Sequence, residues 1–483
     1  MSIPQTTSSA KSELPKQLTL LDSTSIIVGI IIGSAIYEIA PVVAHGASNW
    51  GMNAARTTAS RFGGQPLSDE VLLNVGLAAI VGIWIVGALV ALMGALCYAE
   101  LATAFPQAGG TYVFLSEGLG RPVGFAFAWS EFWIVRPGNV GAVAFVLARY
   151  GVQLLPAKWQ AIPHVDVMLA ATAILSLAGL NALGLRAGKW TQNALTFCKL
   201  VGLAAIVITA LSIPPAKAAV ATTTGSGSLA LAMVLVMFAY GGWADMSFVA
   251  AEVRNPARNI SKALLLGTLL VAAIYLTVNV AFVRVLGIDG LVKSKAVAAE
   301  VVSRRFNEFG SRAISLLVCI SCLGAINGML LTGSRVYYAL GTQHALFRWL
   351  GRFSGGVPLR SLVVQTAITL GLVVGFGIYE QGFERLVVFT GPFYWGFIGL
   401  VGPALAILRW QGRTGDIYRV PLFGLTVSIF TLSSMAMVYS ALDYAIGYTL
   451  ENRSWEWLWA VVVVLSGIMV GMIDYMMRKR GQP

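Results

Sequence analysis

Residues 29–37 read GIIIGSAIY and residues 238–243 read FAYGGW, and these two short stretches decide how the chain is expected to fold. Both lie within long apolar segments, and both are interrupted by glycine. Because Gly costs about 1 kcal/mol relative to Ala inside a helix, each stretch is a place where a helix is expected to unwind. Unwinding inside hydrocarbon is tolerated where the freed N–H and C=O groups face a cavity or a ligand.

The composition around these stretches is typical of a polytopic membrane protein. Of the 483 residues, 57% are hydrophobic and only 11% are charged, whereas a soluble domain has about 25% charged residues. This composition excludes a soluble enzyme and a disordered protein. The abundance of Leu, Val, Ile and Ala without period-two alternation favours helices over a membrane barrel.

Apolar segments long enough to cross a bilayer, which requires about 20 residues in a helix, occur about twelve times. Segments without a charged residue run over 71–99, 167–185, 218–244, 263–283, 313–334, 361–379, 386–408 and 420–442. Shorter or interrupted candidates run over 23–37, 122–148, 200–216 and 457–473. The longest connections, expected to be loops, cover about 45–71 and 284–312.

The distribution of charge predicts the orientation of the spans. The first 21 residues are polar and lack the apolar core of a signal peptide. If they are cytoplasmic, nearly all of the formal net charge of +12 falls on cytoplasmic segments, as the positive-inside rule requires. Attraction to anionic membrane lipid is sufficient to explain this charge, so no nucleic acid partner is expected. We therefore expect both termini in the cytoplasm and the spans in the inner or plasma membrane.

The two glycine breaks fall in the first and sixth spans, and each of these spans opens a five-helix unit. Glycine-interrupted helices in matching positions of two halves indicate the central site of a transporter. We therefore expect an all-α integral membrane protein with the LeuT-type fold, a 5+5 inverted repeat in which helices 1 and 6 are unwound. The alternative is close helix packing through small residues such as Gly29 and Gly33, without a ligand.

This arrangement divides the chain into five segments. They are, in order, a cytoplasmic N-terminal tail at 1–21, a first five-helix repeat at 22–213, a second inverted repeat at 227–408, two additional C-terminal helices at 419–477 and a cytoplasmic tail at 478–483.

The same stretches resemble known signatures. Residues 29–37 resemble GTIIGSGIF of the amino acid–polyamine–organocation (APC) superfamily, in its L-amino-acid-transporter-like branch, and residues 238–243 match its FAYGGW. Residues 249–260, VAAEVRNPARNI, are similar to its VxEEVxNPxRNIP. Further matches are Asn181, Gly184, Gln192, Asn193, Thr196, Lys199, Asn327, Thr332, Gly333, Ser334, Arg335, Arg409, Tyr418, Arg419, Val420 and Pro421. The chain is identified as a member of this family from about residue 22 to 445.

The resemblance implies a secondary active transporter, a permease for amino acids or related amines, that works by alternating access with proton coupling or exchange and without sodium. A carrier for a non-amino-acid organic amine or polyamine is the alternative. A membrane-embedded enzyme or a channel is disfavoured, because the sequence has no convergent catalytic groups, no P-loop and no charged ring. No metal and no cofactor are expected.

The resemblance also implies a substrate site made of backbone groups. The substrate α-carboxylate is held by N–H groups at the broken first helix, where a half-helix N-terminus supplies oriented donors and about half a positive charge. The α-ammonium is held by carbonyls of both broken helices, and Phe238 matches the residue that covers the substrate from outside. The substrate-binding positions so implied are Ile31, Gly33, Ser34, Ala35, Phe238, Gly241 and Gly242.

Three positions depart from the family pattern. Ala35 replaces the second glycine of GSG, and its methyl group either narrows the site or marks a substrate without a standard α-carboxylate. Tyr37 replaces the family's Phe and is a candidate to read the substrate. Position 244, which is often Asn or Asp in relatives, is Ala here and is followed by Asp245. Asp245 either binds a cationic group of the substrate or caps the broken end of helix six.

Lys199 is the most informative ionisable residue, because a buried ammonium is costly. In relatives this lysine occupies the place where sodium-coupled members of the fold bind sodium. The resemblance therefore implies an internal cation that serves coupling, either by titrating or by bridging helices one, five and eight, with Ser321 as a candidate neighbour. Snorkelling of Lys199 to the cytoplasmic interface is the alternative.

The remaining ionisable and sulfur-containing residues are expected to be structural. Glu131 and Arg136 lie five apart, not on one face of an α-helix, so each can pair elsewhere as a structural ion pair or snorkel. The histidines, expected at surfaces or in loops, are His45, His164 and His344, and the cysteines, all within predicted spans, are Cys97, Cys198, Cys319 and Cys322. Some relatives are tethered to a partner glycoprotein by a cysteine after helix three; residues 149–166 contain none, so no disulfide-linked partner is expected.

Overall fold

Helices make up nearly all of the chain that the computed structural model describes, which comprises residues 16–63, 65–216, 228–354, 356–377, 382–452 and 456–480. Within these ranges the β-type pairing is limited to isolated bridges, Leu18 with Val253 and Ser354 with Val357. Most of the predicted N-terminal tail at 1–21, and the last residues of the tail at 478–483, lie outside the described residues. The prediction of an all-α chain is confirmed for the described part.

The helices of the first half are α1 (Leu20–Ile31), α2 (Ala35–Glu38), α3 (Ala40–Arg61), α4 (Asp69–Ala104), α5 (Thr111–Gly118), α6 (Arg121–Ser130), the π-helix η1 (Glu131–Val135), α7 (Arg136–Val152), α8 (Ala157–Gln160), α9 (Val165–Ala182) and α10 (Leu185–Leu211). Those of the second half are α11 (Leu229–Tyr240), the 3₁₀ helix η2 (Trp243–Glu252), α12 (Pro256–Lys293), α13 (Val297–Gln343), the 3₁₀ helix η3 (Ala345–Phe347), α14 (Leu359–Gly377), α15 (Gly382–Trp410), α16 (Phe423–Asn452) and α17 (Glu456–Arg480).

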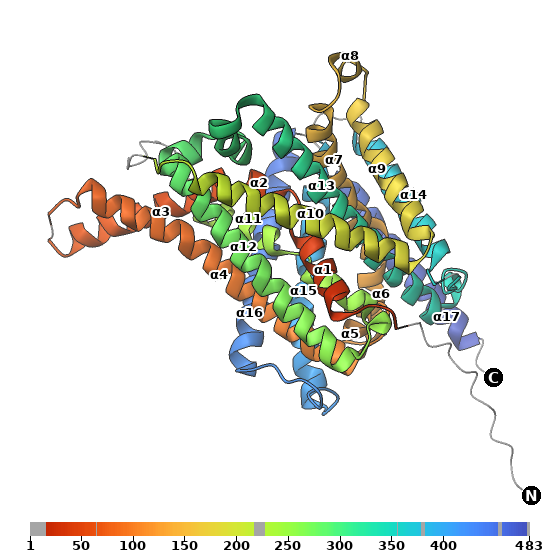
Figure 1. Ribbon diagram of the computed structural model, residues 1–483. Helices are drawn as coiled ribbons and strands as arrows, with labels where there is room; N and C mark the ends of the chain where they lie inside the picture. Colours follow the sequence, from red (N-terminus) through yellow and green to blue (C-terminus); the bar gives the residue numbers. More distant parts are fainter. Residues whose placement is uncertain are drawn as a thin grey trace, which may run out of the picture.

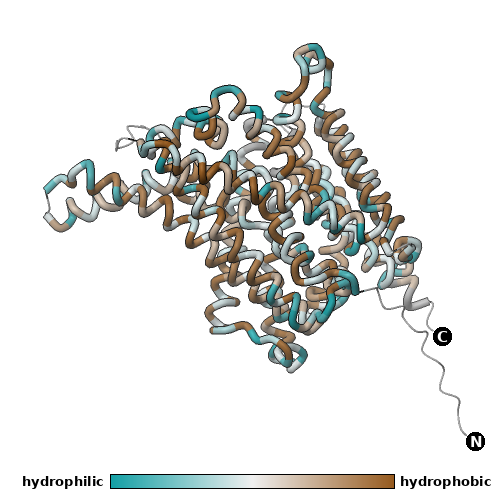
Figure 2. Tube along the Cα trace, in the orientation of Figure 1, coloured by the Kyte–Doolittle hydropathy of each residue, from teal (hydrophilic) through white to brown (hydrophobic). Residues whose placement is uncertain are grey.

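Ten segments of the described chain are long and apolar enough to cross a membrane, so the protein is a multi-pass membrane protein. Figure 2 shows apolar residues along most of the length of these helices. The two other predicted spans fall on the run from α6 through η1 to α7, which contains charged residues, and on a shorter apolar helix, Leu458–Asp474.

Helix α13 lies at the centre of the bundle. It packs against α1, α7, α10 and α14. The most apolar part of α13 is more deeply buried than that of any other described span. Around it, α4 packs along α12 and α15 along α16. In Figure 1, α3 and the N-terminal part of α4 run together and project from one end of the bundle. The expectation of a loop at 45–71 is therefore wrong for most of its length, because α3 continues to Arg61. The expectation of a loop at 284–312 is wrong too, because α12 continues to Lys293 and α13 begins at Val297.

The segment before α1 is tied to the end of η2. The N–H groups of Gln17 and Leu18 donate to Glu252 O, each at 2.9 Å, and Arg254 N–H donates to Leu18 O at 2.8 Å. Helix α1 then begins with a capping box, in which the Thr19 hydroxyl accepts from the N–H of Asp22 at 3.2 Å. These bonds satisfy backbone groups that a helix start leaves free.

His344 lies in the interior, so the expectation of a surface or loop role for this histidine is wrong. Its side chain is 7% exposed. Its Nδ1 lies 2.8 Å from Asp474 Oδ2 of α17, and its Nε2 lies 3.0 Å from the Tyr112 hydroxyl of α5. The imidazole therefore joins the end of α13 to two helices that are remote in sequence.

We predict that His344→Asn lowers the free energy of unfolding by about 2 kcal/mol, because the shorter amide cannot reach both partners and the buried Asp474 loses a bond. The measurement is thermal unfolding of the purified protein in detergent. His164→Asn is the matched control: His164 is exposed, with a positive φ of 55° that Asn tolerates. An equal loss of stability in both variants would contradict the role given to His344.

Candidate functional site

The first interruption separates α1 from α2. Helix α1 ends at Ile31, Ile32 leaves the helical region with φ −78° and ψ 80°, and α2 begins at Ala35. The Gly33 N–H turns back to Ile31 O at 2.8 Å. Among the described residues, the N–H groups of Ser34 and Ala35 have no hydrogen-bond acceptor. Two backbone donors are therefore available where the chain re-enters a helix.

The second interruption follows α11 and brings the chain against the first. Gly241 is extended, and Gly242 has a φ of +110°. A Cβ atom at Gly242 would lie 2.8 Å from Ile30 Cγ2 and 3.6 Å from Ile31 N. Glycine is therefore required at position 242 both by the backbone conformation and by the close approach of α1. The two interruptions meet at this contact.

Tyr275 of α12 connects the two interrupted helices. Its buried hydroxyl donates toward Ile31 O at 3.0 Å and Ala239 O at 3.2 Å. Its ring packs edge-on against Trp84 and tilted against Tyr240. Nothing in the sequence distinguishes this tyrosine from an aromatic core residue, so the sequence alone does not predict its role.

Lys199 of α10 is completely buried and points inward, which excludes snorkelling. Its ammonium donates to three backbone carbonyls: Gly29 O at 2.8 Å, Ile32 O at 2.7 Å and Ser321 O at 3.0 Å. The first belongs to the last turn of α1, the second to Ile32 directly after that helix, and the third to α13. A single cation therefore holds together α10, α13 and the helix end that the first interruption creates.

Tyr37 is connected to Lys199 by way of Ser321, which contacts both residues. The Tyr37 hydroxyl is 3.1 Å from Ser321 Oγ, and both residues are buried. Because Ser321 also offers its carbonyl to Lys199, the serine joins α2 to the lysine site.

Other residues of the motifs form a buried polar chain beside Lys199. Asn327 donates to Gln192 Oε1 at 2.8 Å and accepts from Asn181 Nδ2 at 2.8 Å. Thr196 continues the chain by donating to Ser25 O of α1 at 3.1 Å. These bonds fix the mutual positions of α1, α9, α10 and α13 around the lysine.

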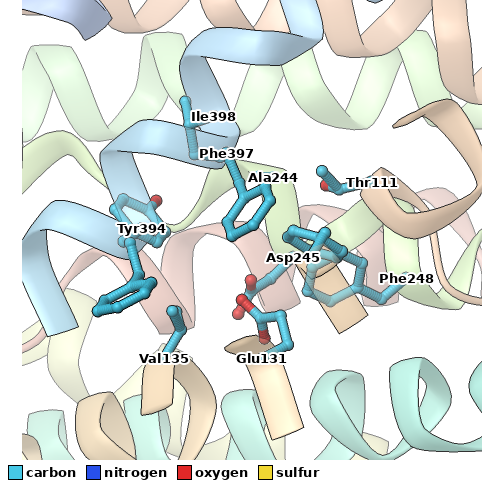
Figure 3. A pocket seen from close by; sticks show the side chains of 11 residues that line it. Thr111, Glu131, Val135, Ala244, Asp245, Phe248, Tyr394, Phe397 and Ile398 are labelled. Atoms are coloured by element: carbon cyan, nitrogen blue, oxygen red, sulfur yellow. The ribbon is translucent and has the colours of Figure 1, made fainter. Parts of the chain in front are cut away.

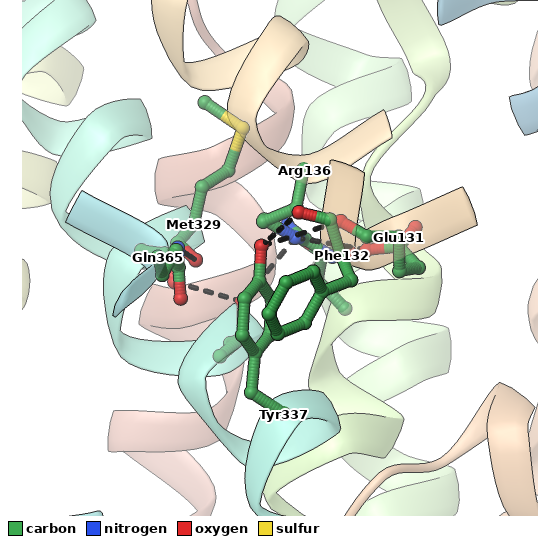
Figure 4. A network of polar contacts seen from close by, with 9 residues as sticks. Glu131, Phe132, Arg136, Met329, Tyr337 and Gln365 are labelled. Carbon is green, nitrogen blue, oxygen red and sulfur yellow. Dashed lines mark hydrogen bonds and ion pairs between the residues drawn. The ribbon is translucent and has the colours of Figure 1, made fainter. Parts of the chain in front are cut away.

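Glu131 and Arg136 form an ion pair with each other, with Arg136 Nε 3.1 Å from Glu131 Oε2 (Figure 4). The expectation that they do not share a helix face is wrong, because residues 131–135 form a π-helix, in which positions i and i+5 come together. Arg136 also reaches Asp245 with both terminal nitrogens, Nη1 to Oδ2 at 2.7 Å and Nη2 to Oδ1 at 3.0 Å. All three side chains are buried.

A small cavity lies beside the second interruption, with Glu131 and Asp245 in its wall (Figure 3). Its other lining residues are Thr111, Phe127, Val135, Ala244, Phe248, Phe393, Tyr394, Phe397 and Ile398. The hydroxyl of Tyr394 would lie 3.4 Å from a Cβ atom at Gly241, so the cavity adjoins the break. Asp245 therefore faces a cavity, while its carboxylate is already bound to Arg136.

Comparison with known proteins agrees with this architecture. The family model for amino acid permeases matches residues 18–470. The chain belongs to the amino acid permease family. This match, together with relatives of the L-type branch, confirms the predicted APC identity and excludes an enzyme.

Three human proteins illustrate what the permease is similar to. It is 28% identical to b(0,+)-type amino acid transporter 1 of Homo sapiens, over 96% of this chain and 88% of the relative. It is 28% identical to the Homo sapiens cystine/glutamate transporter, over 89% of this chain and 80% of the relative. It is also 28% identical to large neutral amino acids transporter small subunit 2 of Homo sapiens, over 82% of this chain and 70% of the relative.

The remaining predicted site residue of the permease is Phe238, whose side chain is exposed. The side chain is 43% exposed, and the Phe238 carbonyl accepts the Gly241 N–H at 3.1 Å. Of the predicted backbone positions, the structure brings Ile31 and Gly242 into direct contact.

We predict that Gly242→Ala destabilises the permease by about 2 kcal/mol, because the new Cβ combines a left-handed backbone with a clash against Ile30. Gly375→Ala is the matched control: a Cβ atom added to this exposed helical glycine of α14 would meet nothing within 4 Å, so the substitution leaves stability equal or up to about 1 kcal/mol higher. Thermal unfolding in detergent compares the two variants. Equal behaviour would contradict the close approach at Gly242.

Proposed function

We propose that this permease is a secondary active transporter that moves amino acids or related amines by alternating access. The observation that carries the proposal is the contact between the two helix interruptions, where Gly242 lies against Ile30 and Ile31 in the interior of an apolar bundle. Backbone groups freed inside a membrane protein need partners, and a transported ligand supplies them.

In this proposal the chain has twelve spans and the 5+5 inverted-repeat fold. The two helices α1–α2 and α11–η2 are then the unwound helices 1 and 6, which open the repeats at 22–213 and 227–408. The run from α6 to α7 and the helix Leu458–Asp474 support the count, since they add two candidates to the ten long apolar helices. The two helices at 419–477 follow the second repeat.

The substrate carboxylate is proposed to bind the N–H groups of Ser34 and Ala35, next to Gly33. Their lack of another acceptor among the described residues supports this assignment. The substrate ammonium is proposed to bind carbonyls of Ile31, Phe238 and Gly241, with Gly242 providing room. Ile31 O already accepts from Gly33 and Tyr275, so Tyr275 must turn wholly to Ala239 O when an ammonium arrives at Ile31.

Lys199 is proposed to serve coupling in place of sodium. Three carbonyl oxygens converging at 2.7–3.0 Å form a cation site, and the lysine ammonium occupies it. This arrangement supports sodium-independent transport, driven by protons or by exchange. Loss of the lysine charge would release the end of α1 from α10 and α13.

We further propose that the permease lies in the inner or plasma membrane with both termini cytoplasmic. The concentration of basic residues on the segments assigned to the cytoplasm supports this orientation. The start of α1 and the end of α17 lie at the same end of the bundle in Figure 1, as an even number of spans requires. No disulfide-linked partner is proposed, since residues 149–166 contain no cysteine.

We predict that proteoliposomes containing the permease accumulate labelled amino acids or amines, that a sodium gradient leaves uptake unchanged, and that a proton gradient or internal substrate stimulates it. The measurement is uptake of a panel of amino acids and amines with each gradient imposed separately. Liposomes without protein are the control. A requirement for sodium would contradict the role of Lys199.

The same panel distinguishes the two interpretations of Ala35. If amines enter while zwitterionic amino acids neither enter nor compete, the permease is an organic amine or polyamine carrier, and the Ala35 methyl marks a change of substrate. If zwitterionic amino acids enter, Ala35 only narrows the site.

We predict that Lys199→Ala lowers uptake at least about tenfold, equivalent to about 1.4 kcal/mol, and abolishes its response to a proton gradient. The reason is that three buried carbonyls lose their cation. Size-exclusion chromatography verifies that the variant remains folded. Lys293→Ala, at a half-exposed lysine paired with Asp289, is the control and leaves uptake unchanged. An unchanged pH response in Lys199→Ala would show that the lysine is structural.

A further inference from the structure

Two carboxylates border the cavity beside the second interruption, and both form ion pairs with Arg136. Glu131 and Asp245 both line the cavity, and Figure 3 shows the two side chains close together. Arg136 is not one of the described residues that line the cavity. A group that enters the cavity therefore meets carboxylate oxygens and not the guanidinium.

The charge of this cluster is not balanced. Arg136 binds both oxygens of Asp245 but only Oε2 of Glu131. Two carboxylates and one guanidinium carry a formal charge of −1, and the other lining residues are apolar, aromatic or hydroxyl-bearing. Within the described part of the chain, Glu131 Oε1 accepts no hydrogen bond. An uncompensated buried charge is costly, so the cluster favours an additional cation.

The walls suit a cation for a second reason. Five aromatic residues line the cavity: Phe127, Phe248, Phe393, Tyr394 and Phe397. The faces of aromatic rings attract cations, and Arg136 already lies 5.2 Å from the centroid of the Phe248 ring. Rings that exclude water also strengthen the attraction between a carboxylate and an ammonium.

The size and place of the cavity limit which part of a ligand it can hold. The empty space accommodates about one water-sized group, which is also the size of an ammonium group. Tyr394, which lines the cavity, also lies close to Gly241 at the second interruption. The cavity is also lined by Ala244 and Asp245, at the start of η2. It therefore fits the end of a ligand whose other end lies at the two interruptions.

We propose that this cavity binds a terminal ammonium group of the transported molecule, so that the permease prefers substrates with a second positive charge, namely basic amino acids or diamines, over neutral amino acids. Glu131 and Asp245 are the specificity-determining residues, and Arg136 positions both of them. This inference rests on the proposed function, because it assumes that the first amino group lies at the helix interruptions.

The test compares uptake of labelled lysine, putrescine and leucine into proteoliposomes at neutral pH. In the wild-type protein we expect lysine or putrescine to be taken up in preference to leucine. Glu131→Gln keeps an acceptor for Arg136 Nε but removes the net charge of the cluster. We expect it to lower the ratio of lysine to leucine uptake about tenfold, as expected for loss of one charged hydrogen bond.

A control variant, a second readout and a second carboxylate variant make the result specific. Glu300→Gln is the matched control, since Glu300 is a half-exposed residue that pairs only with Arg304 within its own helix in the described structure, and it leaves the ratio unchanged. Protection against thermal unfolding gives a readout independent of turnover: lysine should protect the wild-type protein more than leucine does, and this difference should disappear in Glu131→Gln. Asp245→Asn gives the same test from the second carboxylate.

The outcomes separate this inference from the proposed function. Uptake of leucine by the wild-type protein without uptake of lysine or putrescine would overturn the ammonium site and leave the transporter proposal standing. An unchanged lysine-to-leucine ratio in a folded Glu131→Gln protein would also overturn it. Uptake of none of the three, nor of any member of the wider amino acid and amine panel, would overturn the proposed function itself.

Discussion

A backbone carbonyl or amide without a partner inside a membrane costs several kcal/mol, and this constraint organises the centre of the protein. The first helix stops at Ile31, and the carbonyls released there are taken up by two buried side chains from other helices. Lys199 binds the carbonyls of Gly29 and Ile32, and Tyr275 binds that of Ile31. Helices α10 and α12 must therefore lie where they do for the interruption to exist.

Charge inside the bundle follows the same logic, as the two carboxylates of η2 illustrate. Asp245 near its start is held by Arg136, and Glu252 at its end is held by Arg335 at 2.7 and 3.0 Å. All four side chains are almost fully buried, so removing one partner would strand a charge. The 3₁₀ segment that follows the glycine pair thus has an arginine at each end, contributed by α7 and α13.

The sequence was sufficient for features that depend on local pattern. Charge-free runs predicted the apolar helices, and glycine pairs marked the interruptions at Gly33 and Gly242. Features that depend on backbone irregularity or distant partners were missed. The pairing of Glu131 with Arg136 needs a π-helix that ordinary helical spacing does not reveal, and the burial of His344 depends on an aspartate 130 residues away. The low hydrophobicity of residues 45–61 predicted a loop, yet α3 continues through them to Arg61.

The pairing of Leu18 with the chain at Val253 has a mechanical consequence. The entry to the first interrupted helix and the exit of the second are hydrogen-bonded to each other through Gln17, Leu18 and Arg254. Because of these bonds, a displacement of the start of α1 at this end of the bundle also displaces the end of η2. The start of α1 and the end of η2 are therefore mechanically coupled. A molecule that binds the segment before α1 would act on both elements.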